Sequence, residues 1–260
     1  MARPKCKDKT LASLLLWDDR GQDLFEEILS CQQYYPFRAE IELLERNCQK
    51  TLLLLTALEA QRKPVAYFAL DVAEDGLRLS LSSLLKQVSA FQYVTCHGLL
   101  GTYEDCVDFL NSDDARSRQH TIFLWLGNSI ANMAKEEATH LLQRLLHWKS
   151  ESVEMLVSID GCRNSDFILH AYDLLDQRSR AFVRNGLVNL NRVLGDIVFQ
   201  KDDWGFEGLW DPSVGEHRSY HVAKKAMSLQ IVGKDVCIEE RERVLAVTSA
   251  KWRSADVTCL

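Results

Sequence analysis

Four short apolar runs, rich in β-branched and aromatic residues, lie along the middle of the chain and restrict its possible folds more than any other feature. They cover residues 65–72, 91–96, 121–126 and 153–159. Runs of this kind are typical of strands that are buried on both faces of a parallel sheet. The stretches between them can hold crossover helices, most clearly at 77–88 and 135–148. This alternation predicts an α/β fold with a parallel sheet and right-handed crossovers.

The segments on either side of this region differ from it. Residues 39–63 carry apolar side chains at helical spacing without Gly or Pro, which predicts one long helix or two in close succession. Beyond Tyr172, an antiparallel unit is indicated by Trp204, Trp210, Tyr220 and the alternating segment 244–247. We therefore expect an α/β core over residues 38–162 and a smaller α+β domain formed by residues 1–37 together with 163–260.

Composition and charge argue against several classes of protein. The chain has 31 Lys and Arg against 37 Asp and Glu, so its net charge of -6 provides no general basic field for nucleic acid. The apolar runs are far shorter than the roughly 20 residues of a membrane-spanning helix. The N-terminus has no apolar stretch or cleavage site of a secretory signal, which favours a cytoplasmic location.

Eight cysteines are spread along the chain. They include no C-x-x-C pair and no compact Cys/His cluster at metal-ligand spacing. We expect reduced thiols and no metal site.

Ligands of open α/β sheets bind beyond the carboxyl ends of the strands, so the residues after each predicted strand are the first candidates for a site. These are Asp71, His97-Gly98, Gly127-Asn128-Ser129 and Asp160-Gly161. An acidic residue placed as Asp71 is can accept two hydrogen bonds from a ribose diol. The alternative is that its carboxylate caps the following helix, which would leave fewer lone pairs for a ligand.

Nucleotide sites in such folds also use a glycine-rich turn after an earlier strand, and the chain has no glycine between Tyr35 and Pro64. The segment 127–132 could direct backbone amides and Asn132 into a cleft, although Asn and Ser are also common loop and cap residues. Tyr172 could point into the same cleft or be a half-buried helical tyrosine. No G-x-S-x-G turn, Walker loop or kinase signature is present.

A set of motifs in fixed order resembles the histidine-specific S-adenosylmethionine-dependent methyltransferase family, which includes histidine and 4-dimethylallyltryptophan N-methyltransferases. The likeness covers about residues 12 to 253. The motifs are LFEEI at 24–28, YYPFRAE at 34–40, YFALDV at 67–72, CHGLLGTY at 96–103, LGNSIAN at 126–132, FVRNGL at 182–187 and SAKW at 249–252.

This resemblance implies a Rossmann-type methyltransferase core, a substrate domain and S-adenosylmethionine as cofactor. It implies that Lys50, Asp71 and the turn at Gly98 and Leu99 contact the cofactor. It also implies that the residues lining the pocket for an amino-acid substrate are Tyr34, Asn132, Tyr172 and Ser249. Asn132 and Tyr172 would orient the amine that accepts the methyl group.

The chain departs from the family pattern in ways that matter for function. Relatives carry a strand and a glycine-rich loop just before Lys50, and their pattern continues for longer after residues 249–252. We therefore expect an incomplete core that lacks the first βα unit. Val247 stands where histidine-specific members have an acidic residue, and Trp17 stands where they tend to have Tyr. These changes favour an aromatic or indole-type ligand over histidine.

Two functions remain open from the sequence. The first is an S-adenosylmethionine-dependent N-methyltransferase that acts on an amino-acid-derived small molecule in specialised metabolism. The second is a catalytically impaired member of the family that acts as a binding or scaffold protein, or a non-functional shortened product. An O-methyltransferase is a weaker alternative, because a phenol or enol would require a base near the pocket.

Overall fold

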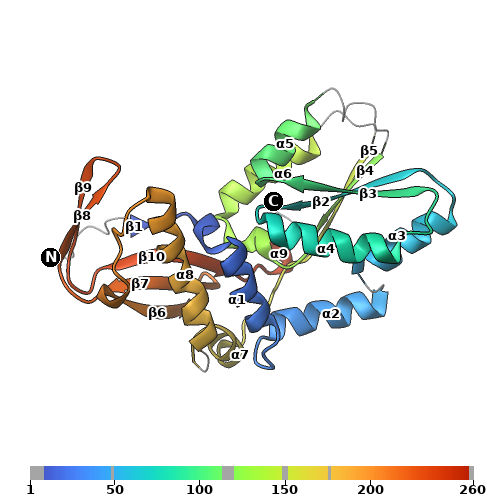
Figure 1. Cartoon of the computed structure of the whole chain (residues 1–260). Coiled ribbons are helices and arrows are strands. Elements are labelled where there is room, and N and C mark those ends of the chain that lie inside the picture. The colour runs from blue at the N-terminus through green and yellow to red at the C-terminus, as the bar shows by residue number, and fades with distance from the viewer. Residues whose placement is uncertain (1–8, 48–49, 113–119, 148–151, 175–176, 258–260) are drawn as a thin grey trace. The chain divides into compact units, whose positions relative to one another are not determined.

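The structure, a computed structural model, describes residues 9–47, 50–112, 120–147, 152–174 and 177–257 (Figure 1). The chain divides into two compact units. Unit 1 comprises Met1–Tyr34, Ala131–Met133 and Asp160–Val257, and unit 2 comprises Tyr35–Ile130, Ala134–Ile159 and Thr258–Leu260. The region from 131 to 133 therefore lies with unit 1, although it follows a strand of unit 2.

Unit 2 alternates helices and strands, as the sequence pattern predicts. Its elements are α2 (Tyr35–Asn47), α3 (Lys50–Ala60), β2 (Val65–Asp71), α4 (Glu74–Gln87), β3 (Val94–Leu100), α5 (Tyr103–Leu110), β4 (His120–Trp125), α6 (Lys135–Leu146) and β5 (Ser152–Val157). A short 3₁₀ helix, η2 (Ser129–Asn132), follows β4 and crosses the boundary between the units. The helical segment 39–63 is two helices.

The four strands of unit 2 form two separate parallel pairs. β2 pairs with β3, and β4 pairs with β5. Within the described residues no strand joins the two pairs into one sheet. The prediction of parallel strands is confirmed, whereas the prediction of a single sheet is wrong for the described part of the chain.

Strand β3 begins three residues later than expected, because the residues before it form a turn. The backbone N–H of Phe91 donates to the carbonyl of Val88 at 2.9 Å. The Glu59 carboxylate accepts from the backbone N–H groups of Gln92, Tyr93 and Val94 at 2.7, 2.9 and 2.9 Å. Partial burial raises the pKa of Glu59, and these bonds lower it, with a net lowering. One side chain therefore holds the start of β3 against α3.

Unit 1 combines the beginning and the end of the chain. Its sheet has the order β1 (Lys9–Thr10), β10 (Arg243–Ala250), β7 (Glu216–Ala223) and β6 (Trp204–Asp211) (Figure 1). β1 runs parallel to β10, and the other pairs are antiparallel. A separate hairpin consists of β8 (Met227–Ile231) and β9 (Lys234–Ile238). The predicted antiparallel strands are confirmed here.

Helices of unit 1 cover this sheet. They are η1 (Ser13–Leu16), α1 (Asp19–Leu29), α7 (Ser165–Leu169), the π-helix η3 (His170–Leu174), α8 (Gln177–Leu194), η4 (Lys201–Asp203) and α9 (Ser254–Val257). Leu16, Leu24 and Phe182 belong to one buried cluster, and Trp204 and Leu187 belong to a second. Gly186 is required in α8 because an added Cβ would lie 2.8 Å from the Leu16 side chain. Unit 1 thus has two buried apolar clusters, and α8 contributes to both.

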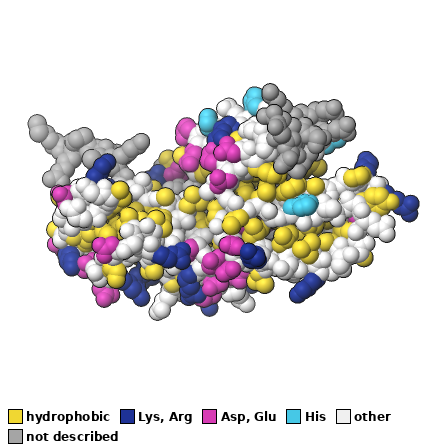
Figure 2. Space-filling view, turned by 45° about the horizontal axis from the view of Figure 1, so that its top comes forward, with side chains coloured by type: hydrophobic (Ala, Val, Ile, Leu, Met, Phe, Trp, Pro, Cys, Tyr) yellow, Lys and Arg dark blue, Asp and Glu magenta, His cyan; other side chains and the backbone are white. Residues whose placement is uncertain are grey.

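The described surface carries both signs of charge. In the face shown by Figure 2, acidic and basic side chains occur in several separate groups among hydrophobic ones. None of the helices in the described ranges combines the length and the apolar composition needed to cross a membrane.

Candidate functional site

Four sequence-predicted residues come together in unit 1 around Tyr172. The ring of Tyr34 meets the ring of Tyr172 edge to face, with 5.7 Å between centroids. Both Tyr34 and Ser249 lie close enough to the Tyr172 hydroxyl to affect its pKa. The Ser249 hydroxyl in turn donates to the Asn132 side-chain oxygen at 3.4 Å. Segments that are far apart in the chain therefore build one polar cluster.

Tyr172 lies in the π-helix η3, and its ring stacks on His217 of β7 with 4.8 Å between centroids. His217 pairs with Ser249 across the sheet, so β7 and β10 place two members of the cluster side by side. Burial, followed by the charge of Asp160, raises the pKa of Tyr172 far above its usual value. Burial also raises the pKa of Tyr34 well above 10. Both phenols are neutral at physiological pH, and neither is a base.

A buried ion pair contacts the cluster at the Tyr172 hydroxyl. Lys251 follows β10, its side chain is 0% exposed, and its ammonium lies 2.8 Å from a carboxylate oxygen of Asp160. The same ammonium donates to the Tyr172 hydroxyl oxygen at 2.8 Å. The sequence placed Asp160 after a strand but assigned it no role. The sequence analysis also did not identify Lys251 and His217 as site residues. The one feature that pointed to Lys251 is its position directly after the apolar strand that ends at Ala250.

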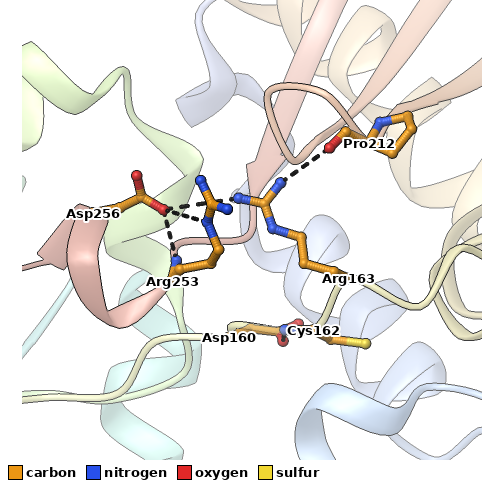
Figure 3. Close-up of polar contacts among 6 residues, drawn as sticks. All are labelled: Asp160, Cys162, Arg163, Pro212, Arg253 and Asp256. Atoms are coloured by element: carbon orange, nitrogen blue, oxygen red, sulfur yellow. Dashed lines mark hydrogen bonds and ion pairs between the residues drawn. The ribbon is translucent and has the colours of Figure 1, made fainter.

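The segment that carries Asp160 is held by its neighbours (Figure 3). The second Asp160 oxygen accepts from the Cys162 backbone at 2.8 Å, and the Asp160 carbonyl accepts from the Trp252 backbone at 3.0 Å. Arg163 donates to the Pro212 carbonyl at 3.4 Å and lies 3.8 Å from the Asp256 carboxylate, which also bonds Arg253. These contacts fix the loop after β5 to the turn after β6 and to α9.

In the turn between β6 and β7, the backbone at Gly215 lies close to the Arg163 side chain. Gly215 has a φ of +75°, and an added Cβ there would lie 1.7 Å from an Arg163 nitrogen. The Gly215 carbonyl accepts from the Lys251 backbone at 2.8 Å. A glycine at this position therefore allows Arg163 and Lys251 to occupy their observed places.

A cavity of about 260 Å³ adjoins Tyr34 in unit 1. It is lined by Ile28, Cys31, Gln33, Tyr34, His170, Ala171, Arg178 and Ser179. Tyr34 and Ala171 connect this cavity to the cluster, because Ala171 precedes Tyr172 in η3. The lining combines apolar, amide and cationic groups.

A second group of polar and aromatic side chains lies at the carboxyl ends of the strands in unit 2. Asp71 ends β2, and its carboxylate accepts from the Ala73 backbone at 3.0 Å. Ala73 is itself the N-cap residue of α4 and the helix has no side-chain cap, so the helix-capping alternative for Asp71 is wrong. The Tyr103 hydroxyl lies 3.1 Å from the Ser129 hydroxyl, and its ring lies 4.5 Å from the ring of Trp125. Burial raises the pKa of Tyr103, Ser129 and Trp125 lower it, and the charge of Asp71 adds a further rise. Tyr103 is therefore close enough to Asp71 to sense its charge.

The other predicted cofactor contacts occupy different positions from those expected. Gly98 and Leu99 lie inside β3, opposite Ala69 and Leu70, so the turn expected there is wrong. The strand continues to Leu100, and the chain bends only at Gly101. Gly98 lies close to α4, since an added Cβ would be 3.3 and 3.4 Å from the Leu81 and Leu77 side chains. Lys50 begins α3, and its side chain lies outside the described residues.

Among the described residues, no group of three or more His, Cys, Asp or Glu side chains could hold a metal ion. The described residues therefore offer two separate candidate sites, the polar cluster within unit 1 and the strand-end group within unit 2. The first resembles a pocket for a small polar molecule with an aromatic part, and the second contains an acid beside aromatic rings.

Comparison with known proteins defines the class. The model of the family described as histidine-specific methyltransferase, SAM-dependent, matches residues 3–50 and 47–260. The chain belongs to this family, whose methyl donor is S-adenosylmethionine.

Individual relatives agree with this class. N-methyltransferase imqF of Aspergillus flavus is 43% identical over 100% of this chain and 76% of its own length. N-methyltransferase benX of Aspergillus terreus is 35% identical over 94% of this chain and 75% of its own length. A 4-dimethylallyltryptophan N-methyltransferase, ifgB of Penicillium roqueforti, is 27% identical over 94% and 80%. The chain is thus similar to several enzymes named for N-methylation.

Proposed function

We propose that this chain is an N-methyltransferase that transfers a methyl group from S-adenosylmethionine to the amine of an aromatic, indole-type amino-acid derivative in specialised metabolism. The observation that carries the proposal is the convergence of Tyr34, Asn132, Tyr172 and Ser249 in unit 1. The names of the relatives support N-methylation, and one relative is named for a tryptophan derivative.

The apolar surroundings of Tyr34 support an aromatic acceptor. Tyr34 packs against the cluster of Leu16, Leu24 and Phe182, and Trp17 and Val247 pack against the same cluster. Trp17 meets Phe25 and Phe182 at centroid distances of 4.9 and 5.1 Å. A valine at position 247 offers no charge to an imidazole, and aromatic rings gain from edge-to-face contacts with their own kind.

Methyl transfer requires the chain mainly to position the acceptor amine relative to the methyl donor. Bound S-adenosylmethionine supplies a methyl group on a sulfonium, and the acceptor must present an unprotonated amine in line with it. Asn132 and Tyr172 would hold the polar end of the acceptor, and the buried rings would exclude water and disfavour the charged ammonium. Asp160 is engaged by Lys251 and the Cys162 backbone, and both tyrosines are neutral. This favours an amine over a phenol, which would need a base.

The residues of unit 2 fit one half of the cofactor. Asp71 stands at a strand end where a carboxylate can accept from a ribose diol, and the Tyr103 and Trp125 rings provide an aromatic surface beside it. One Asp71 oxygen already accepts from the Ala73 backbone, so this local bond and ribose binding would share the carboxylate.

The proposal is tested by incubating the purified chain with radiolabelled S-adenosylmethionine and L-tryptophan, 4-dimethylallyltryptophan, tryptamine or L-histidine. We expect label in an indole acceptor and at least tenfold less in histidine. Asp71→Ala should abolish transfer, while Asp75→Ala, in the first turn of α4, should not. Absence of transfer to every acceptor, with no thermal shift at millimolar cofactor, would remove the proposal.

A second candidate, a catalytically impaired family member that binds without turnover, is favoured by the two separate strand pairs of unit 2. The alignment with imqF spans 284 positions for a chain of 260 residues, which leaves 24 positions (284 minus 260) without a counterpart. The family match also consists of two parts, and one part ends and the other begins between residues 47 and 50. A strand and a glycine-rich loop inserted there would lie between β2 and β4 in a complete sheet. Methyl transfer by the 260-residue chain would exclude this candidate.

A further inference from the structure

The cavity of about 260 Å³ in unit 1 has no function in the site described above. Its lining comes from the end of α1 and the segment after it, from the π-helix η3 and from the start of α8, and α1 and α8 lie side by side (Figure 1). Pockets that enclose a whole drug-sized ligand measure roughly 300–1,000 Å³. This cavity therefore has room for one end of an acceptor molecule.

The charge of the lining favours an anion. Arg178 gives the described lining a permanent positive charge, and none of the described lining residues is acidic. Gln33 and Ser179 add an amide and a hydroxyl, both of which can donate hydrogen bonds. An ammonium group would meet a cation of the same sign here, whereas a carboxylate would meet an opposite charge.

A contact with Cys31 holds Arg178 at the cavity. The Arg178 Nη1 donates to the Cys31 sulfur, which joins the first turn of α8 to the segment that follows α1. An arginine has five N–H donors in a planar fork, so this contact does not exhaust its capacity. Guanidinium groups bind carboxylates through two parallel hydrogen bonds, which give geometric specificity as well as energy. Arg178 is exposed, so a carboxylate can reach it from solvent.

The cavity adjoins the polar cluster, as the binding of an α-amino acid requires. The amine and the carboxylate of such a molecule are bonded to the same carbon, so their binding sites must be neighbours. Tyr34 lines the cavity, and its ring meets the ring of Tyr172. Ala171 also lines the cavity and directly precedes Tyr172 in η3. An acceptor whose amine lies at the cluster can therefore direct its carboxylate into the cavity.

We propose that this cavity is the carboxylate subsite of the acceptor, and that Arg178 is the residue that selects an amino acid over the corresponding amine without a carboxylate. Asn132 and Tyr172 then bind the amine, and Arg178 binds the carboxylate. The inference rests on the proposed function for the identity of the acceptor as an aromatic amino-acid derivative.

The test measures binding to the full chain without cofactor. The ¹⁹F resonances of 5-fluoro-L-tryptophan and 5-fluorotryptamine report two ligands that differ only in the carboxylate. Arg178→Met removes the charge and keeps an unbranched side chain. Arg180→Met is the matched control, because Arg180 belongs to the same helix but is not among the described lining residues, and its guanidinium carbon lies 5.9 Å from the centre of the Phe206 ring.

We expect Arg178→Met to weaken binding of 5-fluoro-L-tryptophan roughly tenfold, the loss typical of a charge-assisted pair, and to leave binding of 5-fluorotryptamine unchanged. Arg178→Lys, which keeps the charge without the planar fork, should give an intermediate loss. Arg180→Met should change neither Kd. Because Arg178 is exposed, the unfolding midpoint should stay the same, and a thermal melt of each variant checks this. Equal weakening of both ligands, or an unchanged Kd for 5-fluoro-L-tryptophan, would overturn the inference.

Failure of the proposed function gives a different result, because the binding measurement needs no methyl transfer. A chain that transfers no methyl group but distinguishes the two ligands through Arg178 keeps the inference and loses the proposed function. Transfer to L-tryptophan and tryptamine with equal KM values, unaffected by Arg178→Met, keeps the proposed function and overturns the inference. Absence of 5-fluoro-L-tryptophan binding to the unaltered chain at millimolar concentration also overturns it.

Discussion

Unit 1 and unit 2 each contain strands and helices, but among the residues that the structure describes only unit 1 joins its main strands into one sheet. The four-stranded sheet of unit 1 brings together His217 and Ser249 from neighbouring strands, and a polar cluster forms on them. In unit 2 the two parallel pairs remain separate, and Ile122, Leu156 and Leu100 on their strands are 54%, 55% and 56% exposed. A pair of strands with open edges buries little apolar surface. The comparison teaches that the proposed substrate site of unit 1 lies on a joined sheet, whereas the proposed cofactor site of unit 2 lies on strand pairs that are not joined within the described residues.

The largest expected effect comes from completing unit 2. Inserting between Asn47 and Cys48 a strand and a glycine-rich loop of the kind that the family resemblance implies should improve S-adenosylmethionine affinity from millimolar to micromolar, which is about 4 kcal/mol. The inserted strand would join β2 to β4, and its glycine loop would receive the methionine end. Calorimetric titration measures the change. A Gly/Ser segment of the same length is the control, and micromolar binding by the unaltered chain would show that two separate pairs suffice.

The next largest difference between the two units should be in how much an apolar substitution reduces the free energy of unfolding. Leu16 is 2% exposed in a tightly packed cluster, so Leu16→Ala should reduce the free energy of unfolding by about 3 kcal/mol. Ile122→Ala, in β4, should change it by less than about 0.5 kcal/mol because that side chain is half exposed. Urea unfolding followed by fluorescence gives both values. Equal losses would mean that Ile122 is covered in solution.

The pH dependence of stability should also come from unit 1. His221 in β7 is 0% exposed, and burial, followed by the charge of Arg184, lowers its pKa to about 4. In the unfolded chain a histidine titrates near pH 6.5, so the unfolded state binds more protons between these values. The contribution of neutral His221 is complete above about pH 6.5 and is lost as the pH falls toward 4.

The free energy of unfolding of the unaltered chain should fall between pH 7 and pH 4.5. In His221→Leu we expect this fall to be smaller by about 2 kcal/mol. Urea unfolding at both pH values measures the difference. The exposed His147, which follows α6 in unit 2, provides the control His147→Leu. Parallel pH profiles for the chain and His221→Leu would contradict the assignment.

The smallest effect concerns the pocket itself. Tyr172→Phe keeps the ring that stacks on His217 but removes the hydroxyl that accepts from Lys251. We expect KM for the indole acceptor to rise about tenfold, or 1.4 kcal/mol, in steady-state kinetics. Tyr93→Phe, in the turn before β3, should leave KM unchanged. A loss of kcat without a change in KM would place Tyr172 in the chemical step instead.

Local pattern was a good guide to the elements of the fold. Apolar runs at 65–72 and 121–126 correspond closely to β2 and β4, because period and composition are properties of a short stretch of chain. The start of β3 was misplaced because it depends on Glu59, which lies more than 30 residues earlier and accepts three backbone N–H groups. The side chains near Gly98 that make it part of a packed strand come from α4 and are equally invisible to a local pattern.

The candidate site was predictable only where a motif carried it. Tyr34, Asn132, Tyr172 and Ser249 were singled out through the family resemblance, and the structure gathers them in unit 1. Asp71 was found from its place after a strand. Its carboxylate bonds the Ala73 backbone before α4 instead of capping the helix, and its role toward a cofactor stays a prediction. Tyr103 and Trp125 were missed, because their contact joins the ends of two different strand pairs.

By itself, the sequence determined the methyltransferase family, the alternation of helices and parallel strands, and the residue types available for a pocket. Only the tertiary structure decided that β2 and β4 belong to separate pairs and that Lys251 lies between Asp160 and Tyr172. The physical reason is that periodicity is a property of neighbouring residues, whereas strand pairing joins separate segments, such as Val65 with Val94 and His120 with Ser152. The partners of the buried Lys251 lie 79 or more residues away in the chain.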